Sequence, residues 1–153
     1  MLKKYRPIWV NTHFNHPNEI TKESREACDR LLCAGIQVNN QSVLLKGIND
    51  SVEVMTKLCH GLLKIGIRPY YLFQCDPVSG TGHLRTSIEK GLEIIKGMRG
   101  FTSGLAVPNF IVDGLNGQGK VPLQPDYIVS KEKDFFILRG YKGDEFKYYN
   151  PEE

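Results

Sequence analysis

The chain has 153 residues, of which 41% are hydrophobic and 24% charged, the proportions of an ordinary globular domain. Its formal net charge of +3 is small and no run of Lys or Arg accompanies it, so the sequence does not predict nucleic-acid binding. No apolar run approaches the roughly 20 residues of a membrane-spanning helix, and the N-terminus lacks the apolar segment of a signal peptide. We therefore expect a cytoplasmic protein with no membrane partner.

The four cysteines predict neither a disulfide framework nor a metal site. Cys28, Cys33, Cys59 and Cys75 form no Cys-x-x-Cys pair, and without a secretory signal they are expected to be reduced thiols. Their predicted positions on helices and at a strand end face in unrelated directions. We therefore expect no metal ion to be bound by these four residues alone.

Apolar runs and amphipathic segments alternate along most of the chain. In order, they predict a strand at 9–14, a helix from the N-cap Thr21 to Ala34, a strand region at 36–45, a helix capped at 49–51 and ending at Gly66, a strand at 68–74, a helix from Ser87 to Gly100, and a strand at 107–113. Such alternation is typical of right-handed βαβ units, so the predicted fold class is α/β with parallel strands.

The pattern changes after Lys120. Residues 127–129 and 135–138 predict a small antiparallel hairpin, and the acidic residues 143–153 are expected to form a frayed tail. This predicts two parts, a parallel α/β part over 1–121 and a hairpin with a flexible tail over 122–153. Four parallel strands do not close an eight-stranded barrel, so the first part reads as a piece of a larger, partial (β/α) barrel.

A glycine-rich stretch connects Asp113 to Lys120. Gly114-x-x-x-x-Gly119-Lys120 matches most of a P-loop, but Val121 stands where the metal-binding hydroxyl belongs and Pro122 opposes the helix that must follow. A second interpretation is a lysine that forms a Schiff base with an aldehyde cofactor such as pyridoxal phosphate. On this stretch alone, an ordinary solvated lysine on a turn is the default.

Candidate polar side chains follow successive predicted strands. His13, Gln41 and Asp76 lie at or just beyond three strand ends, and Asp113 ends the fourth. Because parallel strands present ligands at their carboxyl ends, we expect these side chains to share one rim with Lys120. Asp76 and Asp113 together would form an anionic pocket suited to an ammonium group.

Several segments in register resemble lysine 2,3-aminomutase, and the resemblance extends from about Tyr5 to Leu138. The segments are 9–20 (WVNTHFNHPNEI), 40–47 (NQSVLLKG), 68–71 (RPYY), 74–76 (QCD), 102–104 (TSG), 112–113 (VD) and the Gly-x-Gly-Lys ending at 120. The resemblance implies a radical S-adenosylmethionine (SAM) isomerase of the TIM-barrel type. Such an enzyme uses a [4Fe–4S] cluster and pyridoxal phosphate to interconvert L-lysine and L-β-lysine.

The same resemblance implies roles for individual residues. Lys120 would be the catalytic lysine that carries pyridoxal phosphate. Asp76 and Asp113 would hold the distant ammonium of L-lysine or of a similar cationic amino acid. His13 and Gln41, with Asn11, would contact SAM. The complete enzyme would be a homo-oligomer.

The sequence also departs from the family pattern. The cluster motif Cys-x-x-x-Cys-x-x-Cys is absent, so no iron–sulfur ligands are present in this chain. The cysteine-rich zinc-binding tail is missing, Ser51 stands where that site takes a cysteine, and Phe73 replaces a usual tyrosine. We therefore interpret the chain as the C-terminal part of the enzyme and predict that it is inactive alone. The alternative is an inactive remnant that binds pyridoxal phosphate, lysine or another subunit, and a weaker one is ATP binding by a degenerate P-loop.

Overall fold

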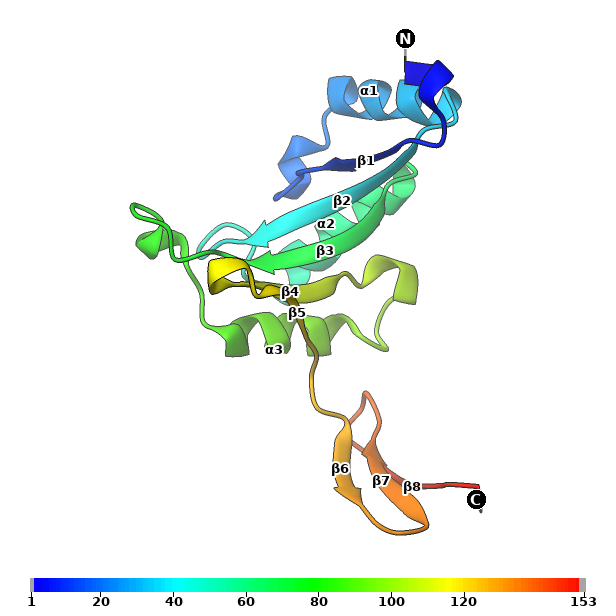
Figure 1. Ribbon diagram of the computed structural model, residues 1–153, viewed down its shortest axis with the longest axis vertical. Helices are drawn as coiled ribbons and strands as arrows, with labels where there is room; N and C mark the ends of the chain where they lie inside the picture. The colour runs from blue at the N-terminus through cyan, green and yellow to red at the C-terminus, as the bar shows by residue number, and fades with distance from the viewer. Residues whose placement is uncertain (1, 152–153) are drawn as a thin grey trace.

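The computed structural model describes residues 2–151, which form two separate sheets and three main helices (Figure 1). The helices and the first sheet comprise α1 Lys22–Cys33, α2 Val52–Lys64, α3 Ile88–Met98, β1 Trp9–Thr12, β2 Gln37–Leu44, β3 Arg68–Gln74, β4 Asn109–Gly114 and β5 Gly119–Leu123. Short 3-10 turns, named η1 to η5, cover Leu2–Tyr5, Pro17–Glu19, Gly82–Leu84, Gly104–Ala106 and Leu115–Gly117.

Each main helix begins where a side-chain oxygen caps it. Thr21, Ser51 and Ser87 are the N-caps of α1, α2 and α3, and each accepts a hydrogen bond from the backbone N–H three residues later. This contact satisfies one of the backbone donors that a helix start leaves without a partner. The three predicted helices and their starting residues are therefore confirmed.

The first sheet has the strand order β1-β2-β3-β4-β5, and its first four strands are parallel, as predicted. The expectation of a loop at Lys120 was wrong, because Lys120 lies in β5, which pairs antiparallel with β4. Pro122 fits this strand because β5 is at the sheet edge, where a residue without an N–H costs no ladder hydrogen bond. The first sheet thus extends to Leu123.

One face of this sheet is packed against the helices and the other is not. In β2 every second residue from Val38 to Leu44 is buried, whereas the residues between them stay partly exposed. Leu44, Leu72 and Phe110 from neighbouring strands join a core with the helix residues Leu58 and Ile94. The opposite face carries Gln41, Tyr71, Phe73, Asp113 and Lys120 and is left open by the helices. The described residues form an open sheet, with β1 and β5 as its edges.

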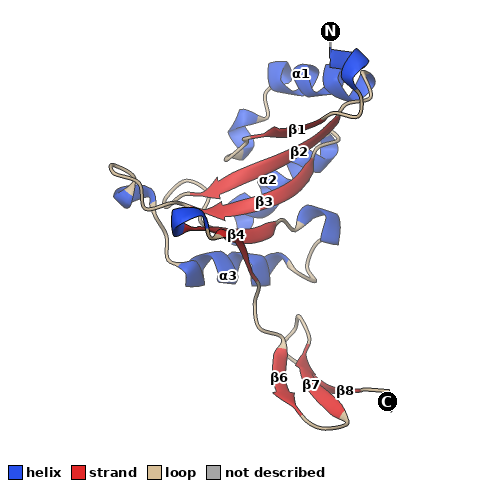
Figure 2. Cartoon of the chain, viewed as in Figure 1, coloured by secondary structure: helices blue, strands red, loops and turns tan. Residues whose placement is uncertain are grey.

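The second sheet contains β6 Ile128–Lys131, β7 Phe135–Arg139 and β8 Glu145–Tyr149, all antiparallel, and no helix packs around it in Figure 2. The predicted hairpin is therefore confirmed, but the frayed tail was wrong within the described residues. Residues 145–149 pair with β7 along their whole length. Phe146, Tyr148 and Tyr149 favour strand structure, and this preference outweighs the acidic composition of the segment. Residues 152–153 of the predicted tail lie outside the described residues.

Candidate functional site

Lys120 and Asp113 form an ion pair across the β4–β5 hairpin. The two residues are directly opposed in the ladder, and Nζ of Lys120 lies 3.1 Å from Oδ1 of Asp113. Opposed residues of antiparallel strands project from the same face, so the strand register itself brings the amine and the carboxylate together. The lysine side chain is 50% exposed and the aspartate 39%, which leaves the amine accessible to a ligand.

The turn between the two strands depends on glycine. Asn116 has φ 56°, Gly117 has φ 80° and Gly119 has φ 82°, all in the left-handed region. Glycine adopts these angles without the steric cost that a Cβ adds, and asparagine tolerates them better than most residues. The turn reverses the chain within a few residues and sets Lys120 opposite Asp113.

An aromatic row lies beside this ion pair on the open face. Nζ of Lys120 is 5.3 Å from the ring centroid of Phe73, and the ring of Phe73 meets that of Tyr71 edge-on at 5.5 Å. Tyr70 donates a hydrogen bond from its hydroxyl to the hydroxyl oxygen of Tyr71 at 2.8 Å. The cation–π contact favours a position of the amine over the face of Phe73. The sequence did not predict this contact of Phe73 with Lys120. The spacing of two residues between Tyr71 and Phe73 does predict that both rings project from the same face of the strand.

His13 and Gln41 meet at the far end of the row. Their Nε2 atoms are 2.7 Å apart, which makes the amide the donor and the imidazole nitrogen the acceptor when that nitrogen carries no proton. Asn39 donates from Nδ2 to Oδ1 of Asn11 at 3.3 Å, and each of these residues comes two positions before Gln41 or His13 on its own segment. His13 and Asn11 are exposed and Gln41 is partly exposed, so all three side chains can contact a ligand on the open face.

Buried polar side chains hold the loop that carries His13. Asn40 accepts from the backbone N–H of Phe14 at 2.7 Å and donates to the carbonyl oxygen of the same residue at 3.0 Å. Ser42 donates to that carbonyl as well, at 2.7 Å. These contacts satisfy buried polar groups and clamp the end of β1 onto β2. Asn40 and Ser42, in the middle of β2, are therefore positioning residues for His13.

Asp76 and Asp113 line one pocket at the carboxyl ends of β3 and β4. The pocket has a volume of about 340 Å³. Its lining residues are Gln74, Cys75, Asp76, Pro77, Arg85, Thr86, Ser87, Ile88, Val112, Asp113 and Gly114. Asp76 itself is exposed in the loop after β3. Lys120 does not line this pocket, and it contacts only Asp113 of the two residues.

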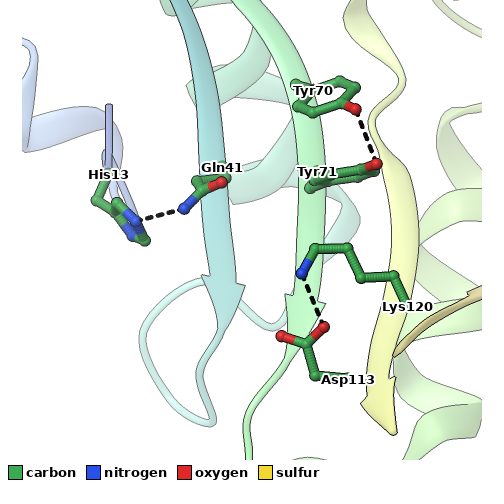
Figure 3. A network of polar contacts seen from close by, with 6 residues as sticks. All are labelled: His13, Gln41, Tyr70, Tyr71, Asp113 and Lys120. Atoms are coloured by element: carbon green, nitrogen blue, oxygen red, sulfur yellow. Dashed lines mark hydrogen bonds and ion pairs between the residues drawn. The ribbon is translucent and has the colours of Figure 1, made fainter. Parts of the chain in front are cut away.

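Four of the predicted site residues form two pairs on the open face (Figure 3). Lys120 with Asp113 makes up one pair, and His13 with Gln41 makes up the other. Gln41 on β2 is opposite Tyr71 on β3 in the strand register. The aromatic row of Tyr71 and Phe73 therefore connects the His13–Gln41 pair to the Lys120–Asp113 pair.

The residues present fit an aldehyde cofactor but offer no ligand set for an iron–sulfur cluster. The side chain of Lys120 is half exposed on the open face, and Schiff-base formation with an aldehyde needs an accessible amine. Among residues 2–151, no group of three or more His, Cys, Asp or Glu side chains is placed to hold a metal ion. The P-loop interpretation is wrong, because a strand follows Gly119 where that motif needs a helix.

None of the described helices has the length and apolar character needed to cross a membrane. This agrees with the absence of a long apolar run in the sequence.

Comparison with known proteins supports the resemblance. A sequence model of the family described as Lysine-2,3-aminomutase matches residues 95–153. The chain is 55% identical to L-lysine 2,3-aminomutase of Bacillus subtilis (strain 168) over 152 residues, which are 99% of this chain and 32% of that protein. It is 54% identical to glutamate 2,3-aminomutase of Clostridioides difficile (strain 630) over 147 residues, which are 96% of this chain and 35% of that protein.

These figures show that the chain spans about a third of the length of the curated relatives it matches. Among solved structures, the crystal structure of a radical SAM methyltransferase from Sphaerobacter thermophilus matches with a TM-score of 0.52 and 18% identity, over 69% of this chain and 33% of that one. At this identity the likeness concerns the fold alone. Because lysine and glutamate aminomutases match almost equally well, overall identity does not choose between the two substrates.

Proposed function

We propose that this chain, which is homologous to part of the L-lysine 2,3-aminomutases, is the C-terminal part of such an enzyme and interconverts L-lysine and L-β-lysine when the rest is supplied. Its open sheet would be one arc of a partial (β/α) barrel, with the face that carries Lys120 turned inward. Residues 122–153 would form a separate small sheet-containing unit. The observation that carries the proposal is the ion pair of Lys120 with Asp113, at the end of the strand where Asp113 and Asp76 line one pocket.

Lys120 is the proposed attachment point for pyridoxal phosphate. Its amine projects from β5 onto the open face, held between the Asp113 carboxylate and the ring of Phe73. When bound, pyridoxal phosphate supplies an aldehyde that engages amino groups and a ring that delocalises an unpaired electron. The protein's contribution at this position is to orient the amine and to exchange its proton with the adjacent Asp113 carboxylate.

Asp76 and Asp113 are the proposed substrate-binding residues. Two carboxylates in one pocket favour a cationic side chain and disfavour an anionic one, because charge-assisted hydrogen bonds form only with the cation. This pair is therefore the feature that favours lysine, or a similar cationic amino acid, over glutamate. His13 and Gln41, with Asn11 nearby, are the proposed contacts to SAM at the other end of the aromatic row.

The iron–sulfur cluster that generates a radical from SAM would have to be held outside this chain, because the cluster motif is absent from the sequence. We therefore expect no aminomutase turnover by this chain alone, either in the cytoplasm, where we propose that it is located, or as a purified protein. Activity, and assembly into a homo-oligomer, would require the cluster-binding part in cis or in trans.

The test is attachment of pyridoxal phosphate to the purified chain. We expect a visible absorbance band after addition of the cofactor, and borohydride reduction followed by peptide mass spectrometry should place the label on Lys120. Lys120→Ala should abolish both signals. Lys46→Ala, which removes another exposed lysine near the same end of the sheet, should change neither. Equal labelling of many lysines, or a label that survives Lys120→Ala, would contradict the proposal.

A further inference from the structure

We infer that Tyr71, supported by Tyr70, is the surface against which the ring of the cofactor carried by Lys120 stacks. The inference rests on the proposed function and adds one contact residue and one positioning residue to it. The side chains of Tyr70, Tyr71 and Lys120 all lie on the open face of the first sheet (Figure 3). Neither tyrosine has a part in the proposed attachment of the cofactor or in the binding of the substrate.

A β-bulge places both tyrosines on this face. Neighbouring residues of a regular strand project from opposite faces, so one of two consecutive tyrosines would normally face the helices. The register of β2 with β3 shifts between Asn40 and Gln41, which leaves Tyr70 as an extra residue without a partner on β2. Tyr70 and Tyr71 are both partly exposed as a result, and Leu72 is buried again. Bulges redirect side chains in this way and are common beside functional sites.

The two tyrosines hold each other in place. Their ring centroids are 3.8 Å apart with 33° between the ring planes, and their hydroxyl oxygens are joined by a 2.8 Å hydrogen bond. Tyr71 also meets the ring of Phe73 at 5.5 Å, with the planes at 69°. These contacts orient the ring of Tyr71 before a ligand arrives, so stacking a planar group against it requires little further ordering.

The amine of Lys120 lies where an attached ring can reach this surface. Its Nζ is 5.3 Å from the ring centroid of Phe73, the same ring that Tyr71 contacts, and 3.1 Å from Oδ1 of Asp113. Pyridoxal phosphate joins a lysine through one aldehyde carbon, so its ring stays close to Nζ. The face of an aromatic ring carries partial negative charge, which disfavours the carboxylate side and favours the aromatic side.

The adenine ring of SAM is the other planar group proposed for the open face. Gln41 is opposite Tyr71 in the strand register, and its amide contacts His13. In Figure 3 that amide points toward His13, whereas the hydroxyl of Tyr71 points in the opposite direction, toward β4. The tyrosine pair is therefore on the side of Lys120, which favours the pyridoxal ring over adenine.

Visible circular dichroism of the bound cofactor tests the contact, because a chromophore gives a strong signal only when the protein fixes its orientation. We expect a clear band from the wild-type chain. Tyr71→Leu should lose most of it and bind pyridoxal phosphate about fivefold more weakly, the effect of losing one aromatic pair. Tyr71→Phe keeps a ring and should retain the band. Tyr148→Leu, which changes an exposed tyrosine of β8, is the control and should behave as wild type.

Tyr70 should act through Tyr71. Tyr70→Leu removes the supporting ring and should reduce the visible band, whereas Tyr70→Phe keeps the ring and should restore it. Borohydride labelling should still place the cofactor on Lys120 in every variant that retains this lysine. Far-ultraviolet circular dichroism should stay unchanged, which separates a positioning role from a loss of folding. The aromatic resonances of Tyr71 give a readout without any variant, and they should shift with pyridoxal phosphate more than with 5′-deoxyadenosine.

Several results would overturn the inference while leaving attachment at Lys120 intact. These are a labelled wild-type chain without a visible band, an unchanged band in Tyr71→Leu, and an equal loss in Tyr71→Phe or Tyr148→Leu. Resonances of Tyr71 that respond to 5′-deoxyadenosine and not to pyridoxal phosphate would assign the surface to the nucleoside instead. A wild-type chain that is not labelled on Lys120 would contradict the proposed function, and the role of Tyr71 with it.

Discussion

Lys120 lies directly opposite Asp113 in the β4–β5 ladder, and its Nζ atom is 3.1 Å from the carboxylate. The backbone of the hairpin, more than side-chain packing, brings these groups together, because both remain substantially exposed to solvent. Exposed ion pairs contribute little to folding. The pair is therefore expected to contribute little to the free energy of folding, and both side chains remain accessible to solvent.

The first prediction follows from this exposure. Asp113→Asn and Lys120→Met should each change the free energy of unfolding by no more than about 1 kcal/mol, the upper range for an exposed ion pair. Phe110→Ala should cost about 3–5 kcal/mol, because that ring is fully buried in the core. Urea unfolding followed by circular dichroism provides the comparison. A loss in Asp113→Asn as large as that in Phe110→Ala would show that the pair is structural.

The second prediction concerns the contact of α3 with the sheet. A Cβ added to Gly91 would lie 2.2 Å from Cζ of Phe110, so this glycine allows the helix to approach the ring closely. Gly91→Ala should destabilise the fold by about 1–3 kcal/mol through overpacking. In Gly104→Ala the added methyl group meets nothing within 4 Å, so thermal and urea unfolding should be nearly unchanged. Similar stability of both variants would mean that α3 can shift away from Phe110 freely.

The sequence predicted the helices and strands better than the tertiary contacts between them. Thr21, Ser51 and Ser87 identified the helix starts because capping is local, and the apolar alternation identified the parallel strands. The pocket that Asp76 and Asp113 both line is at the carboxyl ends of β3 and β4, where the general rule for parallel strands places ligands. These features depend on neighbours in sequence or on topology alone.

The remaining features depend on tertiary pairing. The loop predicted at Lys120 is a strand because Pro122 occupies a sheet edge, where its missing N–H does no harm. The contact of Phe73 with Lys120 needs the order of strands in space, which no local pattern contains.

The third prediction concerns pH. Burial raises the pKa of the Cys59 thiol from 9.0 to about 12. Because the folded state holds this proton more tightly than the unfolded state, the contribution to stability is complete below pH 9 and is lost as the pH rises towards 12. Stability should fall by up to about 1.4 kcal/mol per pH unit in that window.

The control for this prediction is Cys59→Ala, which removes the titrating group. This variant should be less stable overall but should show a shallower decline of unfolding free energy with pH above 9. Thiol labelling gives an independent check, since exposed Cys33 should react quickly and buried Cys59 only after unfolding. Equal pH slopes for the wild-type chain and Cys59→Ala would contradict the assignment.

The fourth prediction links the glycine turn to cofactor attachment. Gly119 has φ 82° with open space around its Cβ position, so Gly119→Ala introduces backbone strain without a clash. Gly143, in the turn between β7 and β8, has φ 96° and equally open surroundings, which makes Gly143→Ala a matched control. Each substitution should cost about 1–2 kcal/mol of stability, the usual penalty for left-handed backbone in a residue with a Cβ.

Only Gly119 adjoins Lys120, so relief of the strain there should move the amine away from Asp113 and Phe73. Gly119→Ala should therefore weaken pyridoxal phosphate binding in absorbance titrations at pH 7, whereas Gly143→Ala should bind the cofactor as the wild-type chain does. Equal affinities in the two variants would show that the turn does not position the lysine, since the strain is the same and only its location differs.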